Sequence, residues 1–315
     1  MSAELTTPTM SPVPIQVGRR RIIPLVEAVG PALPAKATYP HLAPDLLAAL
    51  LSAAGPTYTD PSGTFLRMAS QGFAILGADR VILVDTCLGG PKPARPHPRR
   101  GLDSRWLSAL ERAGIAPADV DTVINTHLHH DHIGWNTTLT DGHLRPTFPN
   151  AQYLITRPEL DHATATTPSV PVADSVLPVQ AAGQLLPCPP DHDLDGEVRL
   201  VPAPGHTPGH VLVEVASQGR RALLAGDLIH HPLQLRHPDI STALCIDPVQ
   251  AAANRRAVLD RYADTDTLLL PSHLPLGGFL RRDGDGYRLA PATHLRPESP
   301  PAVGQVGRHA AYGSR

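Results

Sequence analysis

Residues 126–134 read "THLHHDHIG", which is four histidines and one aspartate in nine positions. Buried neutral histidines need partners and protonated ones repel one another, so this cluster is unfavourable unless something binds it. Imidazole nitrogens and carboxylate oxygens suit Zn²⁺, and they also accept Fe, Mn and Co. Side chains two positions apart in an extended turn point the same way. His127 and His129 can therefore hold one cation, and Asp131 and His132, beyond the bend, can serve a second.

The other candidate ligands also stand directly after apolar segments that read as strands. His206 follows "RLVPAPG", Asp227 follows "RALLAG" and His273 follows "TLLLPS". Ligands at strand ends are held by rigid elements and can project into a common cleft. This placement distinguishes a metal site from a histidine-rich surface.

A purely structural zinc site is the alternative interpretation of the cluster. Structural zinc sites have four ligands and usually include cysteine. The three cysteines, Cys87, Cys188 and Cys245, are scattered and lie outside the motif. Seven candidate ligands without a cysteine favour a catalytic site, and the cysteine spacing indicates no disulfide framework.

Hydrophobic patterning predicts an α/β fold around these motifs. Helices are expected over 43–55, 102–115 and 247–264, with Asp103 or Ser104 as the N-cap of the second. The segment 64–90 predicts antiparallel strands with turns at 71–72 and 77–80. Further strands are expected over 21–30, 120–127, 151–157, 198–206, 210–216, 221–229 and 267–273. Strands that meander and then alternate with helices predict two sheets with helices outside.

The composition is that of a globular protein that buries a hydrophobic core. Of the 315 residues, 42% are hydrophobic and 18% are charged, and the net charge of −2 gives no indication of a nucleic-acid partner. We expect a flexible leader over 1–18, a catalytic domain over 19–289 and an irregular or disordered tail over 290–315. No stretch reads as a signal peptide or approaches the roughly 20 apolar residues of a membrane span. A cytoplasmic protein without a membrane partner, monomeric or homodimeric, is therefore expected.

Four motifs, taken in order, resemble the metallo-β-lactamase-fold metallohydrolases. They are "HLHHDH" (127–132), "PGHTPGH" (204–210), "GD" (226–227) and "SH" (272–273). The resemblance spans roughly residues 21–280 and implies an αββα four-layer sandwich. The lactonase and methyl parathion hydrolase-like branch resembles the chain most. Asp227 stands where many β-lactamases of this fold have cysteine, and His129 stands where the flavin-linked diiron members have glutamate.

The resemblance implies a binuclear metal site, with two divalent ions, most simply Zn²⁺, as cofactors. One metal would be bound by His127, His129 and His206. The other would be bound by Asp131, His132 and His273, with Asp227 bridging both. A hydroxide shared by the two metals would be the nucleophile, because a bound metal can lower the pKa of water from 15.7 to about 7. Asp131 and Asp227 are accordingly assigned to catalysis as well as to metal binding.

Several residues near the motifs are assigned to the surroundings of the metals. His130 is expected to point away from them, whereas Asp85 and His210 are expected to orient metal-bound imidazoles. Trp135 and Phe148 either wall the substrate pocket or simply pack in the core. His230, His231 and His237 follow Asp227, and they either orient substrate or are solvated loop residues. Cys87 is expected to be a small buried residue.

These assignments predict a metal-dependent hydrolase that opens an ester-type bond in a small molecule: a lactone, a carboxylic ester or a phosphotriester. Two alternatives stay open. One is a non-hydrolytic enzyme, a lyase or an iron-dependent oxygenase, on the same set of ligands. The other is a protein that binds a ligand without turnover, against which the complete ligand set argues.

Overall fold

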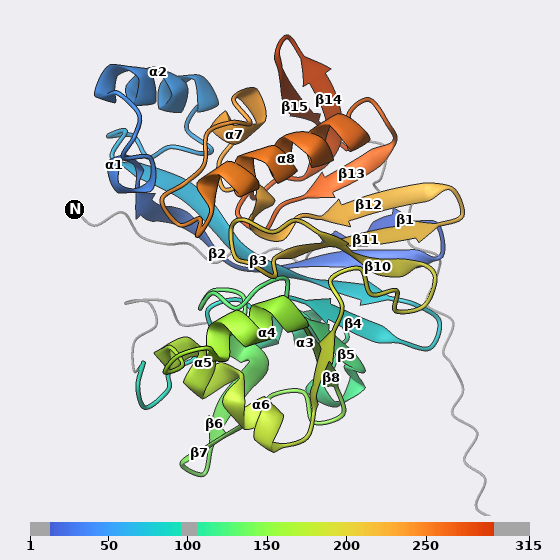
Figure 1. The fold of residues 1–315 in the computed structure, drawn as a ribbon. Helices are drawn as coiled ribbons and strands as arrows, with labels where there is room; N and C mark the ends of the chain where they lie inside the picture. The colour runs from blue at the N-terminus through green and yellow to red at the C-terminus, as the bar shows by residue number, and fades with distance from the viewer. Residues whose placement is uncertain (1–12, 96–105, 293–315) are drawn as a thin grey trace, which may run out of the picture.

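A computed structural model describes residues 13–95 and 106–292 and shows two stacked β-sheets between helices (Figure 1). The first sheet has the strand order β1-β2-β3-β4-β5-β8-β9. Its strands are β1 (Ile15–Val17), β2 (Arg20–Pro34), β3 (Phe65–Leu76), β4 (Val81–Val84), β5 (Thr122–Ile124), β8 (Gln152–Thr156) and β9 (Leu185–Cys188). Strands β4, β5, β8 and β9 pair in parallel, while β1 to β4 pair antiparallel.

The second sheet runs in sequence order from β10 to β15. Its strands are β10 (Val198–Pro202), β11 (Val211–Ser217), β12 (Arg220–Leu224), β13 (Thr267–Leu270), β14 (Gly278–Asp283) and β15 (Gly286–Ala290). Only β12 and β13 pair in parallel, so that Asp227 and His273 follow neighbouring strands at the same edge. A separate hairpin consists of β6 (Thr137–Thr140) and β7 (His143–Pro146).

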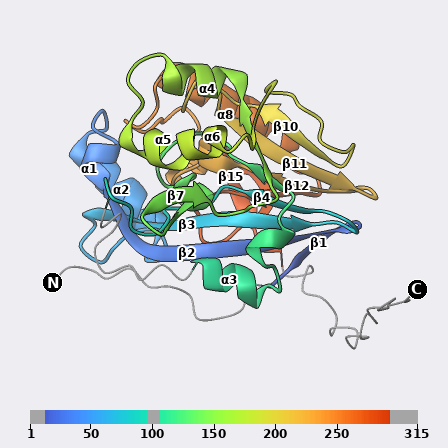
Figure 2. The same cartoon turned by 90° about the horizontal axis from the view of Figure 1, so that it is seen from below.

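Helices cover the outer faces of both sheets. They are α1 (Ala35–Thr38), α2 (Pro44–Ala54), α3 (Trp106–Arg112), α4 (Arg157–Thr164), α5 (Val170–Ser175), α6 (Leu177–Ala181), α7 (Leu233–Arg236) and α8 (Pro248–Tyr262). Short 3₁₀ turns are η1 (Pro117–Asp119), η2 (Gly134–Asn136) and η3 (Gly226–Leu228). Figure 2 shows α3 and α8 on opposite sides of the stacked sheets. This is the expected αββα arrangement. No helix in the described ranges has the length and apolarity that crossing a bilayer requires.

Side chains alternate between the two faces of each strand, and this alternation separates the core into layers. In β4, Ile82 and Val84 point into the cluster between the sheets, while Leu83 points outward to α3. Across the second sheet, Leu224 and Leu270 face the same inner cluster. Leu259 of α8 packs in a third cluster on the outer face of that sheet. Each sheet is thus buried on both faces, which explains its nearly continuous apolar strands.

The structure corrects the predicted turn at 71–72. Strand β3 runs unbroken through Gly72. A Cβ at Gly72 would lie 2.3 Å from the carbonyl oxygen of Asp85, so the glycine permits a close backbone approach rather than a turn. The turn at 77–80 is confirmed by the antiparallel pairing of Leu76 with Val81.

Other predicted boundaries shift as well. Residues 15–17, assigned to the flexible leader, form β1 and pair with residues 20–22 of β2. The expected helix 43–55 is confirmed as α2, ending at Gly55 with φ of 78°. The expected helix 247–264 is confirmed as α8, where Asp247 accepts a hydrogen bond from the Gln250 N–H. Asp103 and Ser104, the expected N-cap of α3, lie outside the described residues, as do 1–12 and 293–315.

Candidate metal centre

The predicted ligands come together at the edge where β5, β10, β12 and β13 end. One group whose ligand atoms all lie within 4.8 Å of one another comprises His127, His129, His206 and Asp227. A second such group comprises Asp131, His132 and His273. The short β5 and the three strands of the second sheet therefore bring both halves of the molecule to one site.

The Asp227 carboxylate lies between the two groups. Its Oδ1 is 3.0 Å from Nε2 of His132 and 3.0 Å from Nε2 of His273. Its Oδ2 is 3.1 Å from Nε2 of His206 and 3.6 Å from Nε2 of His127. One oxygen thus faces each group, which is the arrangement that a carboxylate shared by two cations requires.

Buried atoms at this site lack the hydrogen bonds that a metal-free interior would need. His127 Nε2, His132 Nε2 and Asp227 Oδ1 are buried without a hydrogen-bond partner. A buried polar atom left unpaired costs about 1–3 kcal/mol, so several together need compensation. Nitrogen and carboxylate donors arranged in this way fit divalent cations such as Zn²⁺.

Burial and neighbouring charges shift the pKa values of the ionisable side chains at the site. Burial lowers the pKa of His127 well below its ordinary value, and burial together with the nearby His206 lowers the pKa of His129 to about 4. Burial alone would raise the pKa of Asp227, but His132 and His273 hold it well below its usual range. Burial would also lower the pKa of His132, yet the carboxylates Asp227 and Asp85 raise it. Asp227 is therefore ionised and can serve as a ligand for a cation.

Partners behind the imidazoles fix their orientation. Asp85 Oδ2 lies 2.7 Å from Nδ1 of His132, and its Oδ1 accepts the Thr126 N–H at 2.8 Å. The Ala69 carbonyl oxygen is 2.9 Å from Nδ1 of His273. These contacts leave Nε2 of both rings facing Asp227. Asp85 lies behind a candidate ligand, as expected from the sequence.

His210 also supports the site without facing it. Its Nδ1 lies 3.0 Å from the Ala203 carbonyl oxygen, so its Nε2 accepts the Asp227 N–H at 3.0 Å. Burial, and then the neighbouring His206, lowers the pKa of His210 to about 3. A neutral imidazole therefore fixes the backbone of the central carboxylate.

Of His230, His231 and His237, only His230 joins the site. Its Nε2 lies 3.1 Å from Asp227 Oδ2, and both its ring nitrogens are buried without a hydrogen bond. It also shares a possible ligand group with Asp227 and His273. His231 turns the other way, with Nε2 3.2 Å from the Tyr58 carbonyl oxygen.

The remaining predictions near the motif separate into surface and core residues. The His130 side chain is 55% exposed, and the residue also borders the cavity described below. Trp135 and Phe148 pack with Trp106 in the cluster beneath α3 and are not among the residues that line that cavity. Of the two readings for these aromatic residues, the structure shows core packing. Cys87 is fully buried, as expected.

Glu159 of α4 is a supporting residue that sequence reasoning missed. It is 2% exposed, and its Oε1 accepts the Leu128 N–H at 2.9 Å. Its Oε2 accepts the Gly209 N–H at 3.0 Å. One carboxylate therefore ties the histidine motif to the loop that carries His206. The Leu128 and Gly209 amides are 31 and 50 residues from Glu159 along the chain, and no sequence spacing indicates such a link.

A cavity of about 250 Å³ opens over the ligands. Asp131, Asp227, His129, His230 and His273 form its polar floor. Its walls are mostly apolar and come from the ends of β2 and β3 and from two loops: Ala32, Leu33, Met68, Ala69, Ser70, Leu88 and Leu244. The candidate ligands therefore lie at the bottom of a cavity with mostly apolar walls.

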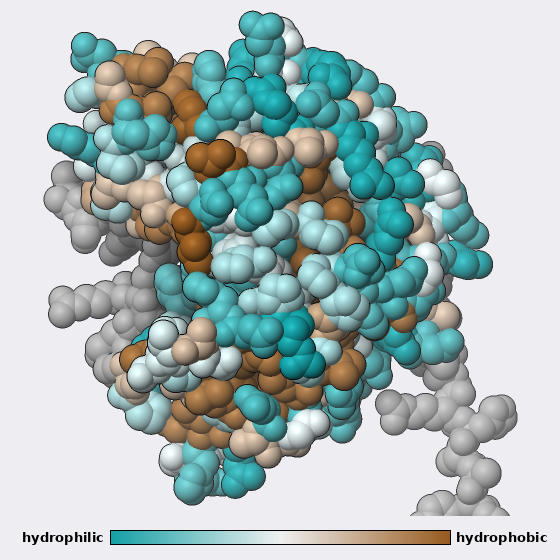
Figure 3. All heavy atoms as spheres, viewed as in Figure 1, coloured by the Kyte–Doolittle hydropathy of each residue, from teal (hydrophilic) through white to brown (hydrophobic). Residues whose placement is uncertain are grey.

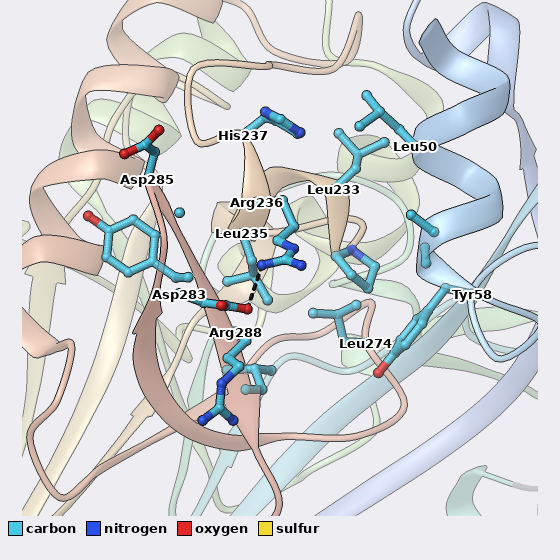
Figure 4. Close-up of a pocket in the computed structure, with 16 residues that line it drawn as sticks. Leu50, Tyr58, Leu233, Leu235, Arg236, His237, Leu274, Asp283, Asp285 and Arg288 are labelled. Atoms are coloured by element: carbon cyan, nitrogen blue, oxygen red, sulfur yellow. Dashed lines mark hydrogen bonds and ion pairs between the residues drawn. The ribbon is translucent and has the colours of Figure 1, made fainter. Parts of the chain in front are cut away.

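His237 lies elsewhere, in a groove of about 680 Å³ between α2, α7 and β15 (Figure 4). Arg236 forms an ion pair with Asp283 across that groove. The groove contains none of the candidate ligands. Beside it, apolar side chains gather on the surface over α2, where Leu46 is 49% exposed (Figure 3).

Comparison with known families agrees with this geometry. The sequence profile of the metallo-beta-lactamase superfamily matches residues 68–273. The chain belongs to the metallo-β-lactamase superfamily. The matched range lies within the expected catalytic domain 19–289 and contains all seven predicted ligands.

Individual relatives of this superfamily member are distant. A probable metallo-hydrolase of Mycobacterium tuberculosis is 26% identical over 254 residues, covering 68% of this chain and 74% of the relative. An N-acyl homoserine lactonase of Bacillus cereus is 28% identical over 124 residues, covering 39% of this chain and 44% of the relative.

Solved structures show the same fold. The dizinc quorum-quenching lactonase AidC has a TM-score of 0.74 at 22% identity, covering 88% of this chain and 96% of its own. The hydrolase AbOPH, of the β-lactamase superfamily, has a TM-score of 0.75 at 21% identity, covering 90% of this chain and 98% of its own. At this identity the likeness establishes the metallo-β-lactamase fold, which confirms the four-layer sandwich expected from the motifs.

Proposed function

We propose that this metallo-β-lactamase-fold protein is a dinuclear metal-dependent hydrolase that opens an ester-type bond in a small molecule. The observation that carries the proposal is the Asp227 carboxylate, whose two oxygens face different groups of histidines. The names of its relatives, a metallo-hydrolase and several lactonases, support the same reading.

The chain would hold one cation with His127, His129 and His206 and another with Asp131, His132 and His273, with Asp227 shared. When bound, two divalent cations, most simply Zn²⁺, supply a hydroxide nucleophile at neutral pH and Lewis acidity for the scissile carbonyl or phosphoryl group. His230 lies beside Asp227 on the cavity floor. From there a ring N–H can donate to the polarised oxygen of the substrate.

The cavity favours an uncharged substrate with an apolar substituent. None of its described lining residues is lysine or arginine, whereas Leu33, Met68, Leu88 and Leu244 offer apolar surface. Lactones, carboxylic esters and phosphotriesters all satisfy this requirement, because each presents a neutral electrophile. The three unpaired cysteines support a reducing compartment such as the cytosol.

A lyase or an iron-dependent oxygenase on the same ligands is the second candidate. The observation that favours this candidate is the ligand set, because imidazole and carboxylate donors bind iron as well as zinc.

Elemental analysis of the purified protein, paired with a screen of lactones, aryl esters and phosphotriesters, tests the proposal. Two zinc, manganese or cobalt ions per chain with turnover of any of these classes would support the hydrolase. Iron with dioxygen consumption and no hydrolysis would replace it with the second candidate.

A further inference from the structure

Helix α8 contains an arginine that is buried without an acidic partner. Arg255 is 1% exposed and is among the largest fully buried side chains. Its neighbour Arg256 pairs with Asp239 at the surface, whereas no carboxylate of the described residues lies within ion-pair distance of Arg255. A guanidinium removed from water in this way is costly unless its donors are used.

Three backbone carbonyls of one segment use those donors. Arg255 Nε donates to the Leu228 carbonyl oxygen at 2.8 Å. One terminal nitrogen donates to the carbonyl oxygens of Pro238 at 2.6 Å and Ile240 at 3.0 Å. The acceptors lie at the two ends of the segment 228–240, so one side chain closes this loop from within.

The same contacts reach the candidate metal centre by two short routes. Leu228 directly follows Asp227, so its carbonyl fixes the backbone beside the central carboxylate. At the other end, Gln234 Nε2 donates to the Ile240 oxygen at 3.0 Å, and its Oε1 accepts the His230 N–H at 2.8 Å. Gln234 is itself fully buried.

We propose that Arg255 is a positioning residue that holds the segment 227–240 in the form in which Asp227 and His230 face the cavity. The planar guanidinium suits this task, because it donates in several fixed directions at once, which a lysine ammonium on a flexible stem does not. The charge strengthens each bond to a carbonyl. The expectation that losing Arg255 weakens metal binding rests on the proposed function. The statement that Arg255 holds the segment 227–240 does not depend on any metal.

Three measurements on the full chain test Arg255→Met, with Arg261→Met, an exposed arginine of the same helix, as a matched control. In the metal-free protein, we expect hydrogen exchange to accelerate in 227–240 and to stay unchanged in β10 and β11. In competition with a chromophoric chelator, we expect Zn²⁺ affinity to fall about tenfold or more, the usual range for lost orienting partners. The visible spectrum of the Co²⁺-loaded variant should change. Arg261→Met should match the wild type in all three.

Arg255→Lys keeps the assay informative if the methionine variant does not fold. It retains the charge but fewer donors, and we expect an intermediate Zn²⁺ affinity and intermediate exchange in 227–240. Uniformly faster exchange across the chain, or wild-type Zn²⁺ affinity with an unchanged Co²⁺ spectrum, would overturn the inference. A wild-type chain that binds no metal would refute the proposed function, and the exchange pattern would still decide whether Arg255 holds the segment.

Discussion

Asp227 shows most clearly how single side chains determine the chemistry of this protein. Its carboxylate is 4% exposed and has four histidine nitrogens within 3.1 Å or less, if His230 is counted with His132, His206 and His273. A lone buried carboxylate would shift its pKa upward and become neutral. The surrounding imidazoles reverse that direction, so Asp227 stays ionised and available to cations.

Asp227→Ala should remove metal from both groups and abolish nearly all activity, because each group loses the oxygen that faces it. Metal content by elemental analysis, together with turnover, checks this outcome. His130→Ala is the control, since its side chain is largely exposed and should leave metal content intact. Equal metal loss in the two variants would contradict the ligand assignment.

His230→Phe tests whether the His230 ring donates to the substrate or binds a metal. We expect metal content to be retained and kcat to fall about 100-fold with a smaller change in KM, because the variant removes a donor to the reacting oxygen. Steady-state kinetics on the best substrate of the screen, with metal analysis alongside, measures both. Loss of one metal per chain would instead make His230 a ligand.

At the level of elements, helices outside the sheets hold the ligand loops in place. Helix α4 ties the histidine motif to the His206 loop through Glu159, and α8 holds the segment after Asp227 through Arg255. The loops beyond the strand ends supply the ligands, and these helices contact those loops directly. The supporting helices therefore set how accurately the ligands meet.

Glu159→Ala should lower the free energy of unfolding by about 3 kcal/mol, because it leaves the buried N–H groups of Leu128 and Gly209 unpaired. Zn²⁺ affinity should fall as well, since both loops carry ligands. Urea unfolding and chelator competition measure the two effects. Glu111→Ala, on the exposed face of α3, should change neither. Unchanged Zn²⁺ affinity in Glu159→Ala would show that the residue serves stability alone.

At the level of the molecule, the candidate metal site lies where residues that follow strands of the two sheets meet. The first sheet leads into His127, His129, Asp131 and His132, and the second contributes His206, Asp227 and His273. The complete set of candidate ligands from both sheets comes together only in the folded chain. A cation that binds this set would therefore stabilise the whole fold.

Removal of metal with a chelator should therefore lower the melting temperature on the order of 10 °C. At a free metal concentration of about 1,000 times Kd, binding adds about 4.1 kcal/mol to the free energy of unfolding. Each kcal/mol shifts the melting temperature by about 2–4 °C for a chain of this size. Scanning calorimetry with and without chelator measures the shift. Zn²⁺ should restore the original value and Ca²⁺ should not. An unchanged melting temperature would contradict a shared metal site.

The metal-free chain should lose stability as the pH falls from about 6.5 toward 4. Burial lowers the pKa of His231 to about 4, below its unfolded value, so its contribution is present above pH 6.5 and is lost during acidification. His132, with a raised pKa, opposes this trend and loses its contribution only as the pH rises. In His231→Gln, the stability deficit against wild type should shrink by about 1.4 kcal/mol per pH unit between about pH 6 and 4.5. Urea unfolding at several pH values measures this difference, and a constant deficit would contradict it.

The sequence by itself determined the fold class of this protein and singled out the candidate ligands. The ligand motifs follow apolar strands, and both the alternation of strands and the spacing of His127, His129, Asp131 and His132 are local properties. Such local patterns can be read from the sequence, because a strand fixes the direction of the residues that directly follow it. The helices α2 and α8 were predictable for the same reason, since their spacing and caps lie within a few residues.

Only the tertiary structure decided what surrounds those ligands. Gly72 lies within β3 rather than in a turn because the Asp85 backbone passes beside it, and Trp135 packs under α3 rather than at the cavity. Arg255 and Glu159 act on carbonyls and amides that are 15 to 50 residues away along the chain. Such contacts depend on how the sheets and helices pack, and no spacing within a short stretch of sequence encodes them.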